Sequence, residues 1–132
     1  MFVRLTLLFA LGVLPLIAQQ KQPNCCEAES EKLSQKQVRA LLQKTEPIEA
    51  PCCADMLHLK GKIVLAITVD RNGDVECVQM ISGHPLITSV AMQSVARWKF
   101  RPHVLKGFAR SFCGKVVLRY QASEYSVKYS VI

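Results

Sequence analysis

The sequence predicts an α+β fold, with one small antiparallel sheet and helices on one face of the sheet. Three observations predict this class. Apolar side chains alternate along residues 62–70, an Asn72-Gly73 turn follows, and residues 85–98 carry an apolar stripe at helical spacing. The order helix, strand, strand, helix, strand lets the sheet bury one face against the helices. The chain has 132 residues, which is enough for one compact domain.

Residues 1–18 have the composition of a secretory signal peptide. Arg4 precedes an apolar run, residues 5–17, and the segment ends in the small residue Ala18. The run of about 13 residues is too short for a membrane span, which needs about 20. We therefore expect cleavage near Ala18 or Gln19 and a periplasmic or secreted protein. An uncleaved anchor in the inner membrane is the alternative.

Residues 19–44 are expected to form a short polar tether and an N-terminal helix. Acidic residues come early in residues 27–44 and basic residues later, which suits the helix dipole. The apolar stripe of this segment is thin, so we expect the helix to lie at the edge of the domain. Its members are Leu33, Val38, Leu41 and Leu42. Residues 45–51 contain two prolines and should be extended.

The main strands follow. Residues 62–70 and 75–81 should pair as a hairpin, because Asn72 and Gly73 accept the positive φ that a tight turn requires. Residues 112–121 form the third expected strand. One of its faces is apolar, with Phe112, Val116, Leu118 and Tyr120. Residues 122–132 form a tail or an extra strand, because apolar residues also alternate along 125–131.

The central helix has a defined beginning and end. Pro85 suits a first helical position, and Pro102 disfavours helix at Arg101. The helix should therefore end near Trp98 or Lys99. Its stripe consists of Ile87, Val90, Ala91, Val95 and Trp98. Trp98 and Phe100 are the expected anchors of the core, because aromatic side chains bury the most area.

Six cysteines in a short exported chain predict disulfides. They are Cys25, Cys26, Cys52, Cys53, Cys77 and Cys113. The two adjacent pairs lack the spacing of a zinc site, and the extended segment 45–51 can retrace the helix, so we expect at least one bond between the pairs. Cys77 and Cys113 are expected to bond to each other, because their thiols would otherwise stay free in an oxidising compartment; the bond requires Cα atoms within about 7 Å. A first strand placed between theirs would make that distance too long.

No pattern of residues indicates catalysis, a cofactor or a metal. The three histidines are far apart in sequence, and the chain has no nucleophile elbow, no phosphate-binding loop and no dinucleotide-binding glycine pattern. We therefore expect no enzyme activity. The net charge of +7 comes from scattered basic residues, which indicates a solvated surface and not a nucleic-acid site.

Several short motifs together resemble the C-terminal domain of the TonB energy transducers. The resemblance covers roughly residues 45–121, which we take as the domain. The matching residues are Gly61, Asn72-Gly73-Asp74-Val75, Ser82-Gly83-His84-Pro85-Leu86, Trp98-Lys99-Phe100-Arg101-Pro102 and Gly107. The resemblance implies the fold that the residue patterns predict.

The resemblance also implies a function. Transducers of this family couple the proton gradient of the inner membrane to outer-membrane receptors, and the domain binds an extended receptor peptide as an added strand. We therefore expect a periplasmic interaction domain for energy-dependent transport. Its partners would be a receptor peptide and the proton-channel complex of the inner membrane. Residues 19–23 reach only about 17 Å, unlike the family's long proline-rich span. The alternative is therefore a stand-alone, disulfide-stabilised binding or structural module.

The third strand is the expected edge for the partner peptide, because strand addition uses unpaired main-chain groups. The expected contacts are Phe112, Lys115, Val117, Arg119 and Gln121. Lys115 and Arg119 share the face opposite the apolar residues of this strand, so they would attract an acidic peptide.

Overall fold

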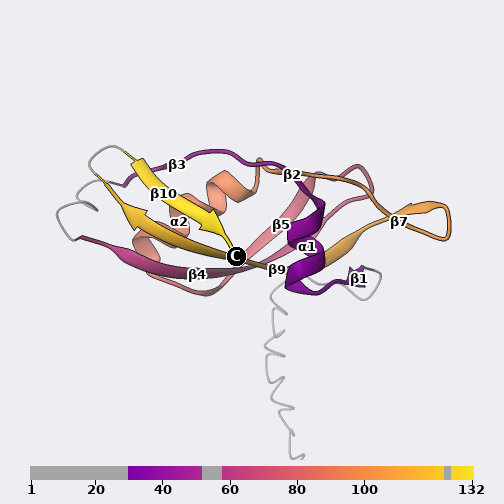
Figure 1. Cartoon of the computed structure of the whole chain (residues 1–132), viewed down its shortest axis with the longest axis horizontal. Helices are drawn as coiled ribbons and strands as arrows, with labels where there is room; N and C mark the ends of the chain where they lie inside the picture. Colours follow the sequence, from indigo (N-terminus) through magenta and orange to yellow (C-terminus); the bar gives the residue numbers. More distant parts are fainter. Residues whose placement is uncertain (1–29, 52–57, 124–125) are drawn as a thin grey trace, which may run out of the picture.

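The computed structural model describes residues 30–51, 58–123 and 126–132. These residues form a mixed α+β fold, in which a curled, mostly antiparallel sheet packs against two short helices (Figure 1). The structure therefore confirms the predicted fold class. The expected signal peptide, and four of the six cysteines, lie outside the described residues.

The elements follow one another from β1 near the start of the described chain to β10 at its end. In order they are β1 (Glu31–Lys32), α1 (Gln35–Leu41), β2 (Leu42–Lys44), β3 (Ile48–Glu49), β4 (Lys60–Val69), β5 (Val75–Ser82), α2 (Pro85–Val95), β6 (Lys99–Phe100), β7 (His103–Leu105), β8 (Phe108–Arg110), β9 (Phe112–Ala122) and β10 (Ser126–Val131). Within the described residues, no helix is long and apolar enough to cross a membrane.

The third predicted strand, residues 112–121, is not an edge strand. The strand order is β3-β10-β9-β4-β5, and β1 also pairs with β9, in parallel. β4 covers one side of β9 along its length, while β10 covers the other side from Leu118 to Ala122. The reason is topological. The crossover through α2 carries the chain past β4, and the last strand then folds back onto β9.

One face of the sheet forms the core, as the alternation in residues 62–70 predicts. Ile63, Leu65, Ile67 and Val69 of β4 are all fully buried. The two predicted anchors are also buried, with Trp98 1% and Phe100 2% exposed. Both helices contribute to the same core, through Val38 of α1 and a stripe of α2. The buried stripe of α2 contains Ile87, Ala91 and Val95.

The central helix begins at Pro85 as predicted but ends at Val95, earlier than expected. Non-local pairing explains the difference. Phe100 donates its backbone N–H to the carbonyl of Gly73 at 2.9 Å, and β6 pairs with β2. Lys99 and Phe100 therefore form a short strand, β6, and the helix does not extend to them.

The N-terminal segment is only partly helical. Ser34 begins α1 with a capping box: its Oγ accepts from the N–H of Gln37 at 3.3 Å, and Gln37 Oε1 accepts from the N–H of Ser34 at 2.9 Å. Glu31 and Lys32 pair with β9 as β1, and residues 42–44 form β2. The expected helix over residues 27–44 is therefore confined to 35–41 in the described chain.

The alternating residues near the C-terminus form a strand and not a loose tail. β10 pairs with β9 through Tyr129↔Tyr120 and neighbouring pairs. Its Val127 is 4% exposed. The alternation at residues 125–131 therefore reflects a strand that belongs to the main sheet.

Candidate binding surfaces

The side chains proposed for partner binding do not lie together at a free edge. Phe112 is fully buried in the core. Lys115, Arg119 and Gln121 are exposed on the outer face of the sheet. The carbonyl of Val117 accepts from the N–H of Ile132 at 3.0 Å, so the C-terminal segment already occupies this side of β9. The prediction of an open edge at β9 is therefore wrong.

β5 lies at the end of the sheet, and no strand of the described ranges pairs with its outer side. The carbonyl of Leu59, just before β4, accepts from the N–H of Ala122 on β9, so the peptide groups of Ala66 and Thr68 face the other way, toward Gln79 and Cys77 of β5. The peptide groups of Val78 therefore face outward. The end of this strand also exposes apolar side chains. Met80 is 46% exposed and Ile81 48%. An open edge with exposed apolar residues can pair with another chain.

A hollow of about 320 Å³ lies beside this edge, between β5 and the second half of α2. Its lining residues are Val75, Glu76, Cys77, Val78, Met92, Gln93 and Ala96. Val75, Val78 and Met92 pack partly against the core. The edge therefore combines outward main-chain groups with an apolar floor that side chains of an added strand could contact.

A second hollow, of about 520 Å³, lies on the outer face of the sheet over β4, β9 and β10. Four cationic side chains are among its lining residues. They are Lys60, Lys62, Arg119 and Lys128. In the sequence these residues are scattered, and composition alone indicates only a solvated surface. Their positions on the polar side of alternating strands were the signal that could have identified them.

Cys77 and Cys113 are not bonded to each other in this fold. Both are in register with Thr68 of β4, from opposite sides. The two cysteines are thus two strands apart, or about 10 Å. A disulfide requires Cα atoms within about 7 Å, so the expected pairing is wrong. The expected bond between the two adjacent cysteine pairs involves residues outside the described chain.

Two of the histidines have structural partners. His84 caps α2, because its Nδ1 accepts from the N–H of Leu86 at 3.3 Å. His103 Nε2 lies 3.0 Å from Glu31 Oε2 and so joins β7 to β1. Within residues 30–51, 58–123 and 126–132, no three His, Cys, Asp or Glu side chains cluster where they could hold a metal.

Tyr120 is the titratable group whose pKa the fold shifts clearly. Its side chain is 5% exposed, on the core side of β9. Burial removes the phenol from water, which disfavours the charged form and raises the pKa of Tyr120 above its ordinary value. The stability of the sheet should therefore depend on pH through Tyr120, and the shift does not indicate a catalytic site.

Comparisons with known proteins agree with the α+β fold described above. The family model described as "Gram-negative bacterial TonB protein C-terminal" matches residues 51–121. A solution NMR structure of the Pseudomonas aeruginosa TonB C-terminal domain has a similar fold, with a TM-score of 0.51 at 18% identity. That match covers 63% of this chain and 86% of the other. A comparison with curated protein sequences gives no match.

Proposed function

Because this chain belongs to the family of Gram-negative bacterial TonB C-terminal domains, a family of energy-dependent transport, we propose that it is a periplasmic domain that binds an extended partner peptide. The partner class is the exposed peptide of an outer-membrane receptor. The domain adds this peptide to its sheet as a further strand. The signal peptide expected at residues 1–18 would deliver it to the periplasm.

The outer edge of β5, with which no strand of the described ranges pairs, carries this proposal. A peptide can pair there without displacing any strand of the described chain, whereas β9 already holds β4 on one side and β10 on the other. Alternate side chains of the peptide would enter the hollow between β5 and α2, where Met92 and Val78 offer apolar contacts. Main-chain pairing provides affinity, and the hollow provides specificity.

A second mode places the peptide on β9 after β10 leaves. β10 is the last strand and pairs with β9 only from Leu118 onward. In this mode Lys115, Arg119 and Gln121 would flank the peptide, as their exposure permits. The cost is the loss of the contacts that Val127 and Tyr129 make with the core. The β5 mode has no such cost, so we favour it.

Hydrogen exchange during a peptide titration separates the two modes. The probe is a synthetic copy of the extended peptide of an outer-membrane receptor from the same organism, which in this family is called the TonB box, and the control is the same peptide N-methylated at alternate residues. We expect the unmodified peptide to slow exchange at Val78 and Met80, and the methylated peptide to lose most of its affinity. Slowed exchange at residues 118–122 with faster exchange in β10 would instead support the second mode. Equal binding of both peptides would contradict strand addition.

A pair of helix variants tests the role of the hollow. Met92→Glu places a charge in it, so we expect peptide affinity to fall at least tenfold. Ser89→Glu adds the same charge on an exposed position of the same helix, and we expect little change. If both variants bind as the parent does, the hollow beside β5 does not receive the partner.

A further inference from the structure

The outer face of the sheet brings together four cations that have no acidic partner among the described residues. Lys60, Lys62, Arg119 and Lys128 line the hollow of about 520 Å³ described above. All four side chains are exposed. Ion pairs within the described ranges involve other lysines and His103, and none involves these four. The positive charge at this hollow is therefore unneutralised by the described part of the chain.

The first row across the sheet places two like charges directly opposite each other. Lys62 of β4 is the register partner of Arg119 on β9, and Ser130 of β10 lies on the other side of Arg119. Like charges at directly opposite positions destabilise a sheet. The pair of Lys62 and Arg119 is therefore unfavourable for stability, and it lies beside the hydroxyl of Ser130, which can donate a hydrogen bond.

The second row lies two residues further along the strands, at a distance of about 7 Å. Here Gln121 of β9 is flanked by Lys60 of β4 and Lys128 of β10. The row thus has a cation at each end and an amide between them. Each of the two rows offers two positive charges and one neutral polar group on the same face.

We propose that this face binds a compact bisphosphate group, with one phosphate on each row. Two phosphate groups carry a charge of about −3 to −4 at neutral pH, which matches the four cations. The spacing of about 7 Å between the rows suits two phosphates on one sugar ring or on one lipid headgroup. Arg119 holds its phosphate with a planar pair of donors, and the lysines act as point charges. The site uses the outer face of the sheet and does not depend on the β5 edge.

A calorimetric titration of the full chain tests the proposal. The probes are fructose 1,6-bisphosphate, glucose 6-phosphate and a tetra-aspartate peptide, at low and at moderate salt. We expect the bisphosphate to bind at least tenfold more tightly than either of the others, and to weaken with salt. Equal affinity for the monophosphate would overturn the two-row site. Equal affinity for tetra-aspartate would show a carboxylate surface and would also overturn it.

Vesicles distinguish the two sources of the ligand. Phosphatidylcholine vesicles that contain phosphatidylinositol 4,5-bisphosphate are compared with vesicles that lack it. If both the sugar and the charged vesicles bind, the site is supported and a lipid headgroup is its ligand. If only the sugar binds, the site is supported and a free phosphorylated sugar is its ligand. Binding to the vesicles alone would overturn the proposal, because the compact group would not suffice.

Three charge-removing variants complete the test. Lys62→Gln and Arg119→Gln should each weaken bisphosphate binding at least tenfold. Lys115→Gln is the matched control, because Lys115 lies on the same face of β9 but does not line the hollow. We expect it to change affinity less than twofold. An equal loss of bisphosphate affinity in all three variants would show that binding depends only on the net charge of the protein, and would overturn the site. Without ligand at low salt, Arg119→Gln should raise the unfolding midpoint, which shows that the fold is intact.

Discussion

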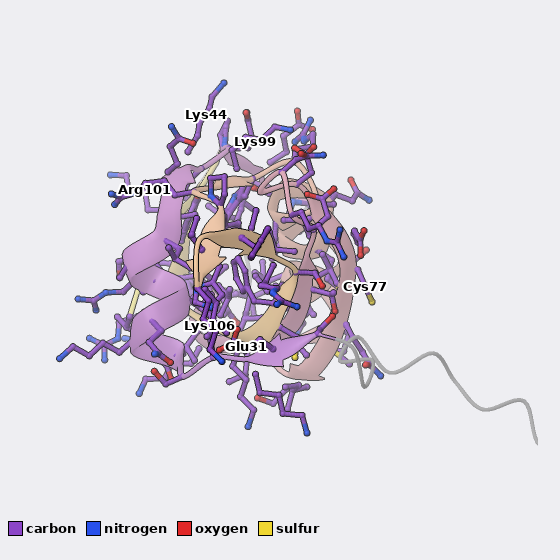
Figure 2. The ribbon with its side chains drawn as sticks, turned by 90° about the vertical axis from the view of Figure 1, so that its right-hand side faces the viewer. Glu31, Lys44, Cys77, Lys99, Arg101 and Lys106 are labelled. Carbon is purple, nitrogen blue, oxygen red and sulfur yellow. The ribbon has the colours of Figure 1, made fainter. Side chains whose placement is uncertain are left out.

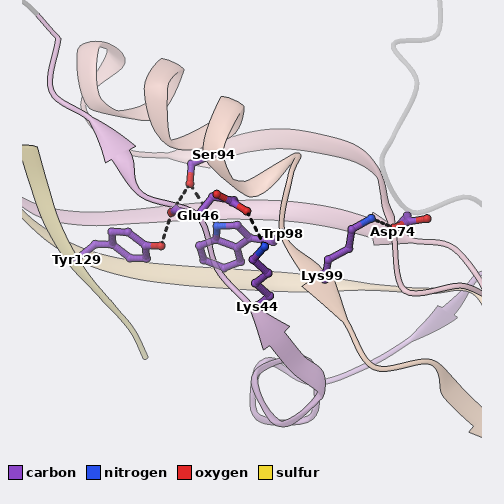
Figure 3. Close-up of polar contacts among 7 residues, drawn as sticks. All are labelled: Lys44, Glu46, Asp74, Ser94, Trp98, Lys99 and Tyr129. Atoms are coloured by element: carbon purple, nitrogen blue, oxygen red, sulfur yellow. Dashed lines mark hydrogen bonds and ion pairs between the residues drawn. The ribbon is translucent and has the colours of Figure 1, made fainter.

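The indole of Trp98 stacks on the ring of Tyr129, with ring centroids 5.9 Å apart and planes inclined by 17°. Trp98 follows the central helix and Tyr129 lies on the last strand, so this contact holds β10 to the core. Figure 3 shows that a chain of hydrogen bonds through Ser94 and Glu46 also joins the two residues. Trp98 Nε1 donates to Ser94 Oγ at 3.2 Å, and Ser94 Oγ and Tyr129 Oη both donate to the carbonyl of Glu46, at 2.7 and 2.6 Å.

Trp98→Ala should be among the most destabilising single changes in the domain. The side chain is 1% exposed, and its loss removes the stacking on Tyr129 as well as buried apolar area. We expect a loss of about 3–5 kcal/mol in the free energy of unfolding, as for large aromatic truncations in cores. Urea unfolding measures it. An unchanged midpoint would contradict the burial of Trp98.

Ser94→Ala tests the polar bridge. Ser94 is fully buried, and its hydroxyl joins the indole N–H to the Glu46 carbonyl. The variant leaves the indole N–H without its partner, so we expect a cost of about 1–3 kcal/mol. Ser89→Ala, at an exposed position of the same helix, is the control and should change stability by less than about 0.5 kcal/mol. Similar thermal midpoints for the two variants would show that the bridge adds nothing.

Two glycines with similar φ separate backbone strain from steric clash. Gly73 has φ +88° and Gly107 has φ +82°. A Cβ at Gly73 would lie 2.0 Å from the carbonyl oxygen of Phe100, whereas one at Gly107 would meet nothing within 4 Å. Gly107→Ala should therefore cost about 1–2 kcal/mol from the left-handed backbone alone. Gly73→Ala should cost clearly more, and chemical denaturation of both variants gives the difference. Equal costs would mean that the turn moves away from Phe100 freely.

Local patterns predicted the parts of the fold that depend on neighbouring residues. The Asn72-Gly73 turn forms because Asp70 Oδ1 accepts from the N–H groups of Asn72 and Asp74, both at 2.9 Å. Pro85 begins α2 as expected. These features depend on only a few consecutive residues, so they can be predicted from the local sequence.

Strand order and the end of α2 depend instead on contacts between distant segments. β10 joins the sheet partly through Tyr129, whose partners are Glu46 and Trp98, and no short window of sequence contains all three. Figure 2 shows Lys44, Lys99 and Arg101 toward the top of the view, where β2 pairs with β6 although the two strands are far apart in the chain. The polar side of each strand can be identified from the sequence, but the gathering of the four cations on the outer face also requires the pairing of β4, β9 and β10.

The cysteine positions give a covalent test of the strand order. Because Thr68 lies between Cys77 and Cys113 across the sheet, peptide mapping of the unreduced protein should find no peptide in which these two cysteines are joined. We expect each of them to be linked to a cysteine from another part of the chain. A dominant Cys77–Cys113 peptide would mean that β4 does not separate β5 from β9.

The buried phenol of Tyr120 should make stability fall at alkaline pH. Burial raises its pKa in the folded state above the value of about 10 that an unfolded tyrosine has. Above pH 10 the unfolded chain therefore loses a proton that the folded chain keeps, and the free energy of unfolding decreases as pH rises. The stabilisation is complete below about pH 10 and is lost as pH rises through the folded pKa. Urea midpoints between about pH 9 and pH 11 should fall more steeply for the parent than for Tyr120→Phe, which has no proton to lose. Parallel curves for the two proteins would show that Tyr120 ionises as easily in the sheet as in the unfolded chain.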